Sequence, residues 1–542
     1  MPRRTPYALI AAVTVCAAAT AVPAVSAAAM SAVASSTGST SSSASTLDLG
    51  PSGLTETRTV RTIEPGVTVT HIVRGTADPS VRWVVEASIP STGTSPDPDA
   101  PAQSIQDEAS AQDYAARLTA AGFPASASRV MQPATADVPA SVLGWRVRLD
   151  STYATQSEAA AEVARLKSAG FTTHAWYGGW DGTSTARGPW SVNVVTIDPK
   201  LFHGRLGSTF GPTIEARETT SWLAGYTKAK AAVNGGFFVL DPAAGAPGDP
   251  AGAGVYGGTL ESEPVGTRPV LVLGADAKHT EITRPQWHGD ALLPSGDVQL
   301  DGLNRVPGLI RNCGGDSGDA PTALPLHDTT CADPNELVLF TPEFGASTPS
   351  GAGSEAVVDG QGRVLRTLGQ RGTALRPGER SLQGIGDLAP LVAGLHPGQR
   401  VRITTALTDG AQPLTRRGAS VVNGGPELVQ GGAVHITQRQ DGMVHPGQPS
   451  FAYGWVLQRN PRTFAGVDAQ GRTLLVTVDG RQPDQLGLSI PEAAAVARSL
   501  GMVDAMNLDG GGSTTMVVDG QLTTHPSDAT GERPVGDAIV VR

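Results

Sequence analysis

Residues 502–518 read Met502-Val503-Asp504-Ala505-Met506-Asn507-Leu508-Asp509-Gly510-Gly511-Gly512-Ser513-Thr514-Thr515-Met516-Val517-Val518. An apolar run leads into one carboxylate, three consecutive glycines and three hydroxyl side chains, and a second apolar run follows at once. Apolar runs separated by a glycine-rich turn are typical of β-strands. The stretch therefore predicts a strand, a tight loop and a second strand.

The predicted loop contains groups that suit chemistry on an anion. Successive glycine N–H groups can form an anion-binding nest, and the hydroxyls of Ser513 and Thr514 add hydrogen-bond donors. Asp509 stands at the mouth of this loop, where a carboxylate can act as acid, base or nucleophile. The structural alternative is an ordinary glycine-rich hairpin turn with a capping Asp.

Two other strand-like runs end in the same kind of turn. Ala231-Ala232-Val233 runs into Asn234-Gly235-Gly236, and Ser420-Val421-Val422 runs into Asn423-Gly424-Gly425. Three such turns, each introduced by Asn or Asp, predict polar groups converging at one rim of a sheet. Arginines in nearby turns are candidates for bidentate contacts with phosphate or carboxylate, or for ordinary surface ion pairs. They are Arg462, Arg481 and Arg533.

Composition restricts the class of protein. The 542 residues suffice for two or three domains, and 66 glycines and 41 prolines favour a strand- and turn-rich fold. The formal charge is −10, and no basic run follows the N-terminal segment, so nucleic acid is not an expected partner. We expect an α+β protein with few helices, two of them at residues 219–230 and 489–500.

The N-terminus predicts export. Arg3 and Arg4 precede an apolar stretch of residues 7–21, and Val25-Ser26-Ala27 offers a cleavage site, which is the pattern of a signal peptide over residues 1–29. We expect no membrane span after its cleavage. Cleavage would leave Cys313 and Cys331, which suggests a disulfide in an exported chain; two unpaired thiols are the alternative.

The remaining chain divides into three parts. Residues 30–56 are rich in Ser, Thr and Ala and predict a disordered linker. Residues 57–180 contain an internal repeat of strand, Ala-rich helix, Gly-Phe and strand, which predicts a small βαββαβ domain with Ser157 as one N-cap. A different, strand-rich texture begins near Trp190 and marks a third part over residues 188–542.

The repeat part resembles the SPOR (sporulation-related repeat) domain in its strand, its Ala-rich helix and its Leu-x-x-x-Gly-Phe motif. The resemblance implies binding to glycan strands of peptidoglycan. A generic adaptor of ferredoxin-like topology is the alternative.

The third part resembles the phosphodiester glycosidase family. Six segments match in the family's order: Asn234-Gly-Gly-Phe-Phe238, Gly424-Gly-Pro-Glu-Leu-Val429, Asn460-Pro-Arg-Thr463, Val478-Asp-Gly-Arg481, Asn507-Leu-Asp-Gly-Gly-Gly-Ser513 and Glu532-Arg-Pro-Val535. The resemblance implies release of a GlcNAc-like sugar from a sugar-1-phosphodiester by cleavage of the anomeric C–O bond. The SPOR-like part adds the expectation that the substrate is a phosphoglycan of the bacterial cell wall. Asp509 is the first catalytic candidate and Asp479 the second. The substrate-binding candidates are Asn234, Gly235, Gly236, Arg462, Thr463, Arg481, Gly510, Gly511, Gly512, Ser513, Thr514 and Arg533.

Other chemistries have no support in the sequence. The histidines lack metal-ligand spacing, and the glycine loop lacks the Gly-Lys-Ser/Thr of a nucleotide P-loop, so we expect neither a metal nor a cofactor. Two alternatives stay open: a catalytically silent protein that binds peptidoglycan, and a phosphodiesterase that cleaves the P–O bond.

Overall fold

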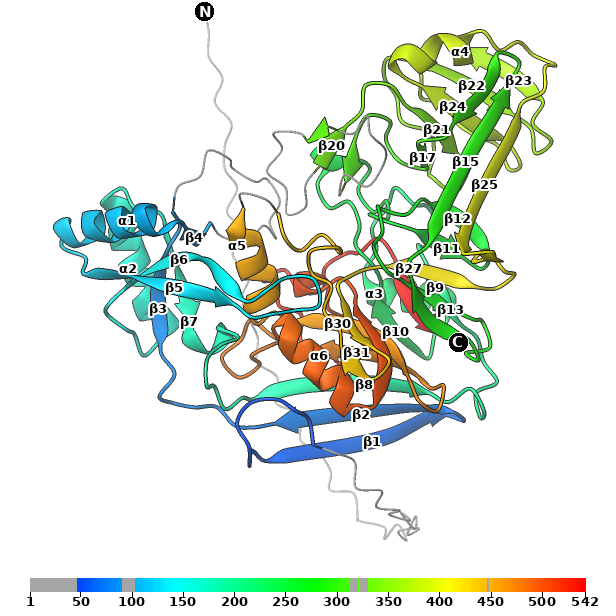
Figure 1. Ribbon diagram of the computed structural model, residues 1–542. Helices are drawn as coiled ribbons and strands as arrows, with labels where there is room; N and C mark the ends of the chain where they lie inside the picture. Colours follow the sequence, from blue (N-terminus) through cyan, green and yellow to red (C-terminus); the bar gives the residue numbers. More distant parts are fainter. Residues whose placement is uncertain (1–45, 90–102, 312–319, 322–329, 446–447) are drawn as a thin grey trace, which may run out of the picture. The chain divides into compact units, whose positions relative to one another are not determined.

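The computed structural model describes residues 46–89, 103–311, 320–321, 330–445 and 448–542 (Figure 1). It is dominated by strands and has six α-helices in these residues, which confirms the α+β prediction. The predicted signal peptide and Cys313 lie outside the described residues, so the disulfide stays a prediction; Cys331 is a buried residue of β20 (Thr330–Ala332). None of the helices in the described ranges is long and apolar enough to cross a membrane.

An eight-stranded antiparallel sheet forms the centre of the glycosidase-like part. Its strands, in spatial order, are β1 (Glu56–Glu64), β2 (Val67–Arg74), β8 (Trp190–Ile197), β31 (Thr473–Val478), β30 (Arg462–Asp468), β32 (Met502–Asn507), β28 (Glu427–Gln430) and β29 (Ala433–Val434). The middle strands are apolar on both faces because both faces are covered. Helix α6 (Ile490–Ser499) packs against one face. Ser489 caps it within a capping box with Glu492.

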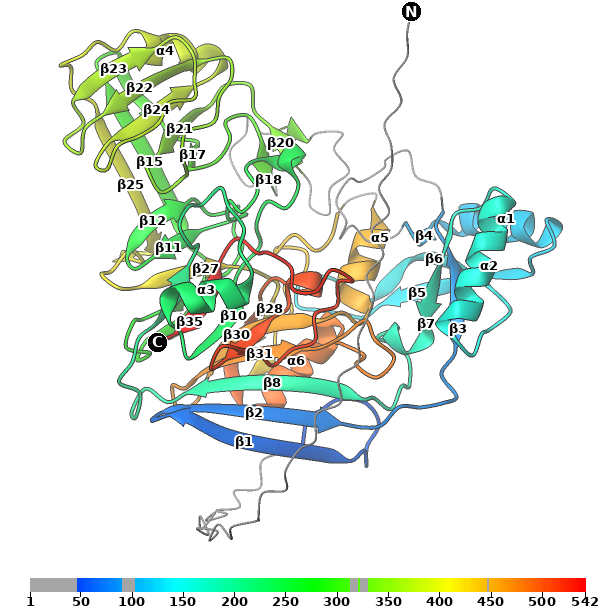
Figure 2. The ribbon, with the colours of Figure 1, turned by 180° about the vertical axis from the view of Figure 1, so that it is seen from behind.

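A second sheet covers the other face of the first. Its order is β34 (Gln521–Leu522), β33 (Met516–Val518), β10 (Ala231–Asn234), β35 (Ala538–Val541) and β9 (Leu206–Thr209). Apolar side chains of both sheets share one buried core. Helix α3 (Thr220–Thr227) packs on the outer face of the second sheet, in front of β10 and β35 in Figure 2.

The remaining strands of this part form four more sheets. The third sheet contains β12 (Thr259–Ser262), β11 (Gly254–Tyr256), β27 (Ser420–Asn423), β13 (Val270–Leu273) and β14 (Thr280–Thr283). The others contain β16 (Gly296–Gln299), β15 (Gln286–Leu293), β25 (Arg402–Asp409) and β26 (Gln412–Pro413); β17 (Gly302–Leu303), β21 (Leu337–Phe340), β24 (Arg380–Gly384), β22 (Ser354–Val358) and β23 (Val364–Leu368); and β18 (Ile310–Arg311), β20 and β19 (Ala320–Pro321). Short helices complete the chain: α4 (Ala389–Ala393), α5 (Pro449–Ala452), η1 (Gly178–Trp180), η2 (Pro242–Ala244), η3 (Gly386–Leu388), η4 (Tyr453–Leu457) and η5 (Gly511–Ser513).

The repeat domain has the predicted β-α-β-β-α-β order. Its elements are β3 (Trp83–Ala87), β4 (Ile105–Gln106), α1 (Glu108–Ala120), β5 (Ala125–Gln132), β6 (Ser141–Leu149), α2 (Gln156–Ser168) and β7 (Thr173–Tyr177). The N-cap of α2 is Thr155, in a capping box with Glu158, and not Ser157 as the sequence analysis expected. Thr155 is placed one residue before the first helical turn, where its hydroxyl reaches the Glu158 N–H.

The Leu-x-x-x-Gly-Phe motif ends both repeat helices in the same way. Phe123 N–H donates to Leu118 O (3.0 Å), and Phe171 N–H donates to Leu166 O (2.9 Å). Gly122 and Gly170 have φ of 89° and 87°. This is the Schellman motif, in which glycine takes the left-handed position and the following apolar residue packs on the helix. The sequence motif therefore encodes a helix end and a core contact together.

Two predicted boundaries are wrong. Strands β1 and β2, which the sequence analysis assigned to the repeat domain, pair in the large sheet, with β2 beside β8 from Val67↔Ile197 to Arg74↔Trp190. The end of the predicted linker is also ordered, because Leu47 and Leu49 are buried against the core that contains Trp190. Long-range pairing and burial decide both points, and neither leaves a local signal in the chain.

Candidate active site

Three glycine turns meet in the glycosidase-like part, but they come from three different sheets. The turn at Asn234 follows β10 of the second sheet, the turn at Asn423 follows β27 of the third, and the turn at Asp509 follows β32 of the first. The expectation of a single rim of one sheet is therefore wrong. The convergence depends on how the sheets stack.

The side chain of Asn234 joins two of these turns. Its Oδ1 accepts hydrogen bonds from Thr463 Oγ1 (2.6 Å) and from the Thr515 N–H (3.1 Å). Its Nδ2 donates to the backbone oxygen of Asp509 (2.8 Å). Asn234 and Thr463 are fully buried. Both side chains thus hold the backbone around Asp509 in place.

The turn at Asn423 is joined to both others. Asn423 Oδ1 accepts from the Phe237 N–H (2.9 Å), and the Gly425 N–H donates to Asn507 O (2.8 Å). Asn507 Nδ2 returns a hydrogen bond to Gly425 O (3.0 Å). At Gly236 a Cβ atom would lie 2.5 Å from Asn423 O, so the close approach of these turns requires glycine.

Asp509 lies half-buried at the junction. Its N–H donates to Gly235 O (3.2 Å), and its Oδ1 accepts from the Gly510 N–H (2.9 Å). The latter contact holds one carboxylate oxygen against the glycine loop. The carboxyl is therefore oriented by the loop backbone.

The backbone of the glycine loop is mostly committed to the loop itself. The Gly511 N–H donates to Pro461 O (3.0 Å), Ser513 to Gly510 O (3.2 Å) and Thr514 to Gly511 O (3.3 Å). The predicted nest of free amides is therefore wrong, because four of the amides of residues 510–514 already donate within the protein. Gly511 has φ of 60°, which allows the tight turn.

Side chains supply the remaining polar groups of the loop. Ser513 Oγ and Thr514 Oγ1 are buried and have no hydrogen-bond partner among the described residues. A Cβ atom on Gly512 would lie 2.3 Å from Nη2 of Arg533, so this guanidinium rests directly on the loop. Arg533 also donates to both carboxylate oxygens of Asp528, at 2.8 and 3.0 Å.

A second arginine lies close to Arg533. Burial lowers the pKa of Arg217, and the positive charge of Arg533 lowers this pKa further. Two neighbouring guanidinium groups repel each other unless an anion lies between them. Asp528 already pairs with Arg533, and Arg217 adds a second guanidinium close to that pair. Arg217 was missed in the sequence because nothing in its neighbourhood marks it.

Asp537 is the most informative residue that sequence analysis missed. It is buried, and its Oδ1 accepts from the Gly236 N–H (2.9 Å) while Oδ2 accepts from Tyr256 Oη (3.0 Å). Burial raises the pKa of Asp537 to about 6, and the negative charge of Asp509 contributes to this shift. Two coupled carboxyls with different exposure can take different protonation states. Asp537 follows the Glu532-Arg533-Pro534-Val535 segment by two residues, which is the one signal that pointed toward it.

Asp479 lies in a different environment. Its carboxylate is buried and accepts from Ser191 Oγ (3.0 Å) and from the His525 N–H (3.0 Å), and burial raises its pKa. Arg481 has φ of 60° and donates to Asn460 Oδ1 (3.3 Å). Residues 479–481 approach the glycine loop through Pro461, because a Cβ atom on Gly480 would lie 2.6 Å from Pro461 N.

The side chain of Arg462 points into the protein. Its guanidinium is buried and donates to the backbone oxygens of Leu488 (2.9 Å), Trp455 and Gln458. Burial, together with the nearby positive charge of Arg481, lowers the pKa of Arg462 to about 9. This geometry differs from the expected phosphate contact, because the guanidinium is bound to three backbone carbonyls. Two of them lie in or next to η4, and the third lies just before α6. Arg462 is a structural clamp behind the loop.

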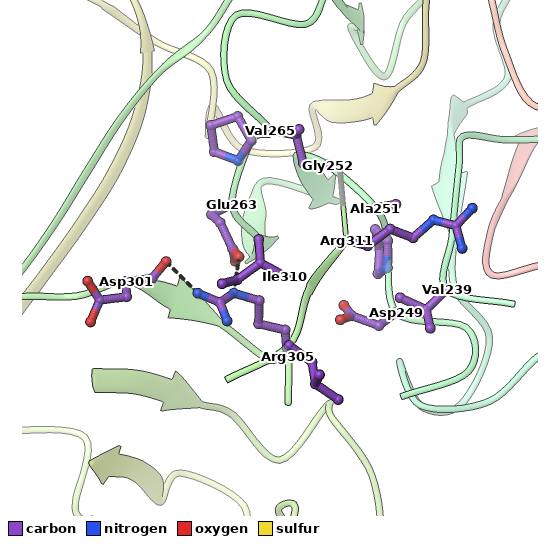
Figure 3. A pocket seen from close by; sticks show the side chains of 13 residues that line it. Val239, Asp249, Ala251, Gly252, Glu263, Val265, Asp301, Arg305, Ile310 and Arg311 are labelled. Carbon is purple, nitrogen blue, oxygen red and sulfur yellow. Dashed lines mark hydrogen bonds and ion pairs between the residues drawn. The ribbon is translucent and has the colours of Figure 1, made fainter. Parts of the chain in front are cut away.

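A small cavity, shown in Figure 3, has residues on both sides of β11 and β12 in its lining. It is lined by residues that include Asp249, Glu263 and Arg305, and Arg305 Nε donates to Glu263 Oε1 (2.7 Å). Its volume of about 30 Å³ suits one or two water molecules. It is therefore too small for a sugar. Within the described ranges no group of three or more His, Cys, Asp or Glu residues is placed to hold a metal ion.

Comparison with protein families places both parts of the chain. The phosphodiester glycosidase model matches residues 352–542, and the SPOR domain model matches residues 102–174. The N-acetylglucosamine-1-phosphodiester alpha-N-acetylglucosaminidases of Bos taurus and Mus musculus are 35% and 36% identical to this chain over 102 residues. These matches cover 19% of this chain and 19% and 20% of the two enzymes, so the chain spans about a fifth of the length of the curated relatives it matches.

One solved structure is similar over nearly the whole chain. It is described as an exported protein of Burkholderia pseudomallei, is 34% identical and superposes with a TM-score of 0.80. The match covers 92% of this chain and 98% of the other. The matched family models show that the chain carries a phosphodiester glycosidase domain over residues 352–542 and a SPOR domain over residues 102–174.

Proposed function

We propose that this protein is a hydrolase that releases a sugar from a sugar-1-phosphodiester, with Asp509 as the reacting carboxylate. The observation that carries the proposal is the position of Asp509. It is half-buried where three glycine turns meet, and the guanidinium of Arg533 lies on the same loop. A carboxylate beside a fixed cation suits a substrate that has both an anomeric carbon and a phosphate.

A phosphate leaving group needs little or no protonation by an acid of the protein. The bond between C1 and the phosphate oxygen breaks, and its electron pair leaves with the phosphomonoester. Asp509 either attacks C1 and forms a glycosyl ester, which water then hydrolyses to release the sugar, or it takes the proton from a water molecule that attacks C1 directly. Arg533 and Arg217 stabilise the developing negative charge on the phosphate. The hydroxyls of Ser513, Thr514 and Thr515 are nearby donors that have no hydrogen-bond partner among the described residues.

The other candidates take supporting roles in this proposal. Asn234, Gly235, Gly236 and Thr463 fix the backbone on either side of Asp509, and Gly510, Gly511 and Gly512 give the loop its shape. Asp537 holds the Gly236 amide and is coupled to Asp509. We assign Asp479 to positioning, because Ser191 and His525 occupy its carboxylate, with Arg481 bound to the neighbouring Asn460.

The SPOR domain suggests where the substrate is found. This domain implies binding to peptidoglycan, and the similarity to an exported protein agrees with a location outside the cytoplasm. We therefore propose a phosphoglycan of the cell wall as the physiological substrate and GlcNAc as the first sugar to test. The charge beside the loop and the wall-binding domain support this choice.

Hydrolysis of methyl GlcNAc-1-phosphodiester by residues 46–542 tests the proposal. We expect free GlcNAc from the wild type and none from Asp509→Asn. Asp504→Asn is a matched control, because Asp504 lies on the same strand and binds the Gly431 N–H at the far side from the loop. In H₂¹⁸O, label in the sugar means C–O cleavage, whereas label in the phosphate contradicts the proposal. Wild-type activity in Asp509→Asn would exclude Asp509 as the reacting group.

A further inference from the structure

Helix α3 exposes two aromatic side chains on its outer surface. Trp222 is 44% exposed and Tyr226 54% exposed, although both are large apolar rings. They are four residues apart on the helix, so they lie on one face, and their rings stack with centroids 5.0 Å apart and planes at 13°. We call this pair the aromatic platform.

The platform does not build the core. Leu223 and Ala224 of the same helix are buried against the second sheet and anchor α3 there. The N-cap is Thr219, whose hydroxyl accepts from the Trp222 N–H (3.2 Å). The helix is thus capped and packed without either ring. Two adjacent exposed rings on a helix that does not need them for folding indicate a binding role.

The platform is tied to the segment that carries Arg533. Ser221, the residue before Trp222, donates to Glu532 from its N–H (2.7 Å) and from its Oγ (2.6 Å). Glu532 precedes Arg533, which rests on Gly512. A backbone bridge between Glu218 and Val535 holds the same two segments together, with hydrogen bonds of 3.2 and 2.9 Å. The start of α3 therefore lies beside the phosphate-binding side of the candidate active site.

We propose that the aromatic platform is a subsite for a neutral pyranose ring of the glycan, next to the unit whose phosphodiester is cleaved. This inference rests on the proposed function for the position of the scissile bond. The C–H groups of a pyranose are weakly positive and stack on the negative face of an aromatic ring. The indole N–H and the phenol O–H offer hydrogen bonds to sugar hydroxyls at the edge of the platform. The platform thus selects a polymer over a small phosphodiester.

The test compares hydrolysis of a long and a short substrate by residues 46–542. The long one is a tetramer of GlcNAc-1-phosphate units, and the short one is methyl GlcNAc-1-phosphodiester. In the double variant Trp222→Ala/Tyr226→Ala we expect KM for the tetramer to rise about 5-fold, since an aromatic contact of this kind is worth about 1 kcal/mol. KM for the short substrate and kcat for both should change less than about twofold, which is within the spread of a distant substitution. Trp222→Phe/Tyr226→Phe keeps the ring faces and should retain most of the affinity.

Several results would overturn the subsite. They are an unchanged KM for the tetramer in the alanine variant, or an equal rise for both substrates. A concentration-dependent dimer that the alanine substitutions dissolve, seen by sedimentation, would make the platform a self-association surface. Calorimetric binding of the tetramer to Asp509→Asn separates this inference from the proposed function. Loss of that binding in the alanine variant would support the platform even if the wild type hydrolyses neither substrate, and unchanged binding would refute it.

Discussion

Substitution of Asp537 by Asn should change how the stability of this protein depends on pH. Burial raises the pKa of Asp537 from 3.8 to about 6 in the folded protein. Each tenfold change in proton affinity is about 1.4 kcal/mol, so the ionised carboxylate lowers the free energy of unfolding by about 3 kcal/mol. The folded state binds more protons than the unfolded chain between pH 3.8 and pH 6. This destabilising contribution is therefore absent below pH 3.8, grows as the pH rises, and is complete above pH 6.

The carboxamide introduced by Asp537→Asn cannot ionise, so the variant should lack this pH dependence. We expect the free energy of unfolding of the variant, minus that of the wild type, to increase by about 2.5 kcal/mol between about pH 4 and about pH 7.5. Urea unfolding at a series of pH values across this range measures the difference. Any constant offset reports the changed hydrogen bonds to Gly236 and Tyr256, because these do not titrate in this range.

Two further variants make the measurement specific. Asp297→Asn removes an exposed carboxylate on β16 and is the control for the loss of one carboxylate. In the Asp509→Asn background the rise should shift to lower pH, because the charge of Asp509 is one cause of the raised pKa of Asp537. A difference for Asp537→Asn that stays constant from about pH 4 to about pH 7.5 would refute both the raised pKa and the coupling between the two carboxyls.

Other predictions concern the loop, its clamp and the repeat domain. Gly512→Ala should lower kcat/KM at least about tenfold, about 1.4 kcal/mol, because the added Cβ would lie 2.3 Å from Nη2 of Arg533 and displace this side chain. Gly369→Ala is the control and should leave kcat/KM unchanged, because nothing lies within 4 Å of its added Cβ. Equal kcat/KM values for both variants would argue against a role for Arg533. Arg462→Met should lower the free energy of unfolding by about 3 kcal/mol, because buried backbone carbonyls lose their hydrogen-bond donor. A variant that is as stable as the wild type in urea would contradict the structural role of Arg462. Phe123→Ala and Phe171→Ala should each lower the free energy of unfolding by about 3 kcal/mol. The double variant should lose about 1 kcal/mol less than the sum of the two single losses, because the two rings meet edge to face with centroids 6.3 Å apart. Strictly additive losses in thermal or urea unfolding would exclude this contact.

The arrangement of three sheets explains why the site needs so many asparagines. Each turn leaves a strand of a different sheet, and the pairing of β28 with β32 and of β10 with β33 brings the strands next to the turns together. The carboxamides of Asn234, Asn423 and Asn507 add to this pairing within the turns, since each bonds to the backbone of a neighbouring turn. Buried carboxamides held in this way make such a junction rigid.

The sequence alone determined the features that depend on neighbouring residues. The strands before Asn234, Asn423 and Asp509, the N-cap at Ser489 and the two helix ends at Gly122 and Gly170 were all predictable. In each case the apolar period, the cap or the glycine acts within about six residues, so its physical effect is local. The order of the six family motifs could also be read from the sequence, because a motif is defined by its residues and not by their position in space.

The tertiary structure decided which of these groups lie in contact and which hydrogen-bond partners and pKa each of them has. The chain does not reveal that β1 and β2 join the large sheet, that Asp537 lies under Gly236 beside Asp509, or that the Arg462 guanidinium is held on backbone carbonyls. These outcomes depend on the stacking of sheets whose strands are far apart in the chain. Burial then sets the pKa of each carboxyl and the partner of each arginine, and burial is a property of the packed protein and not of the local sequence.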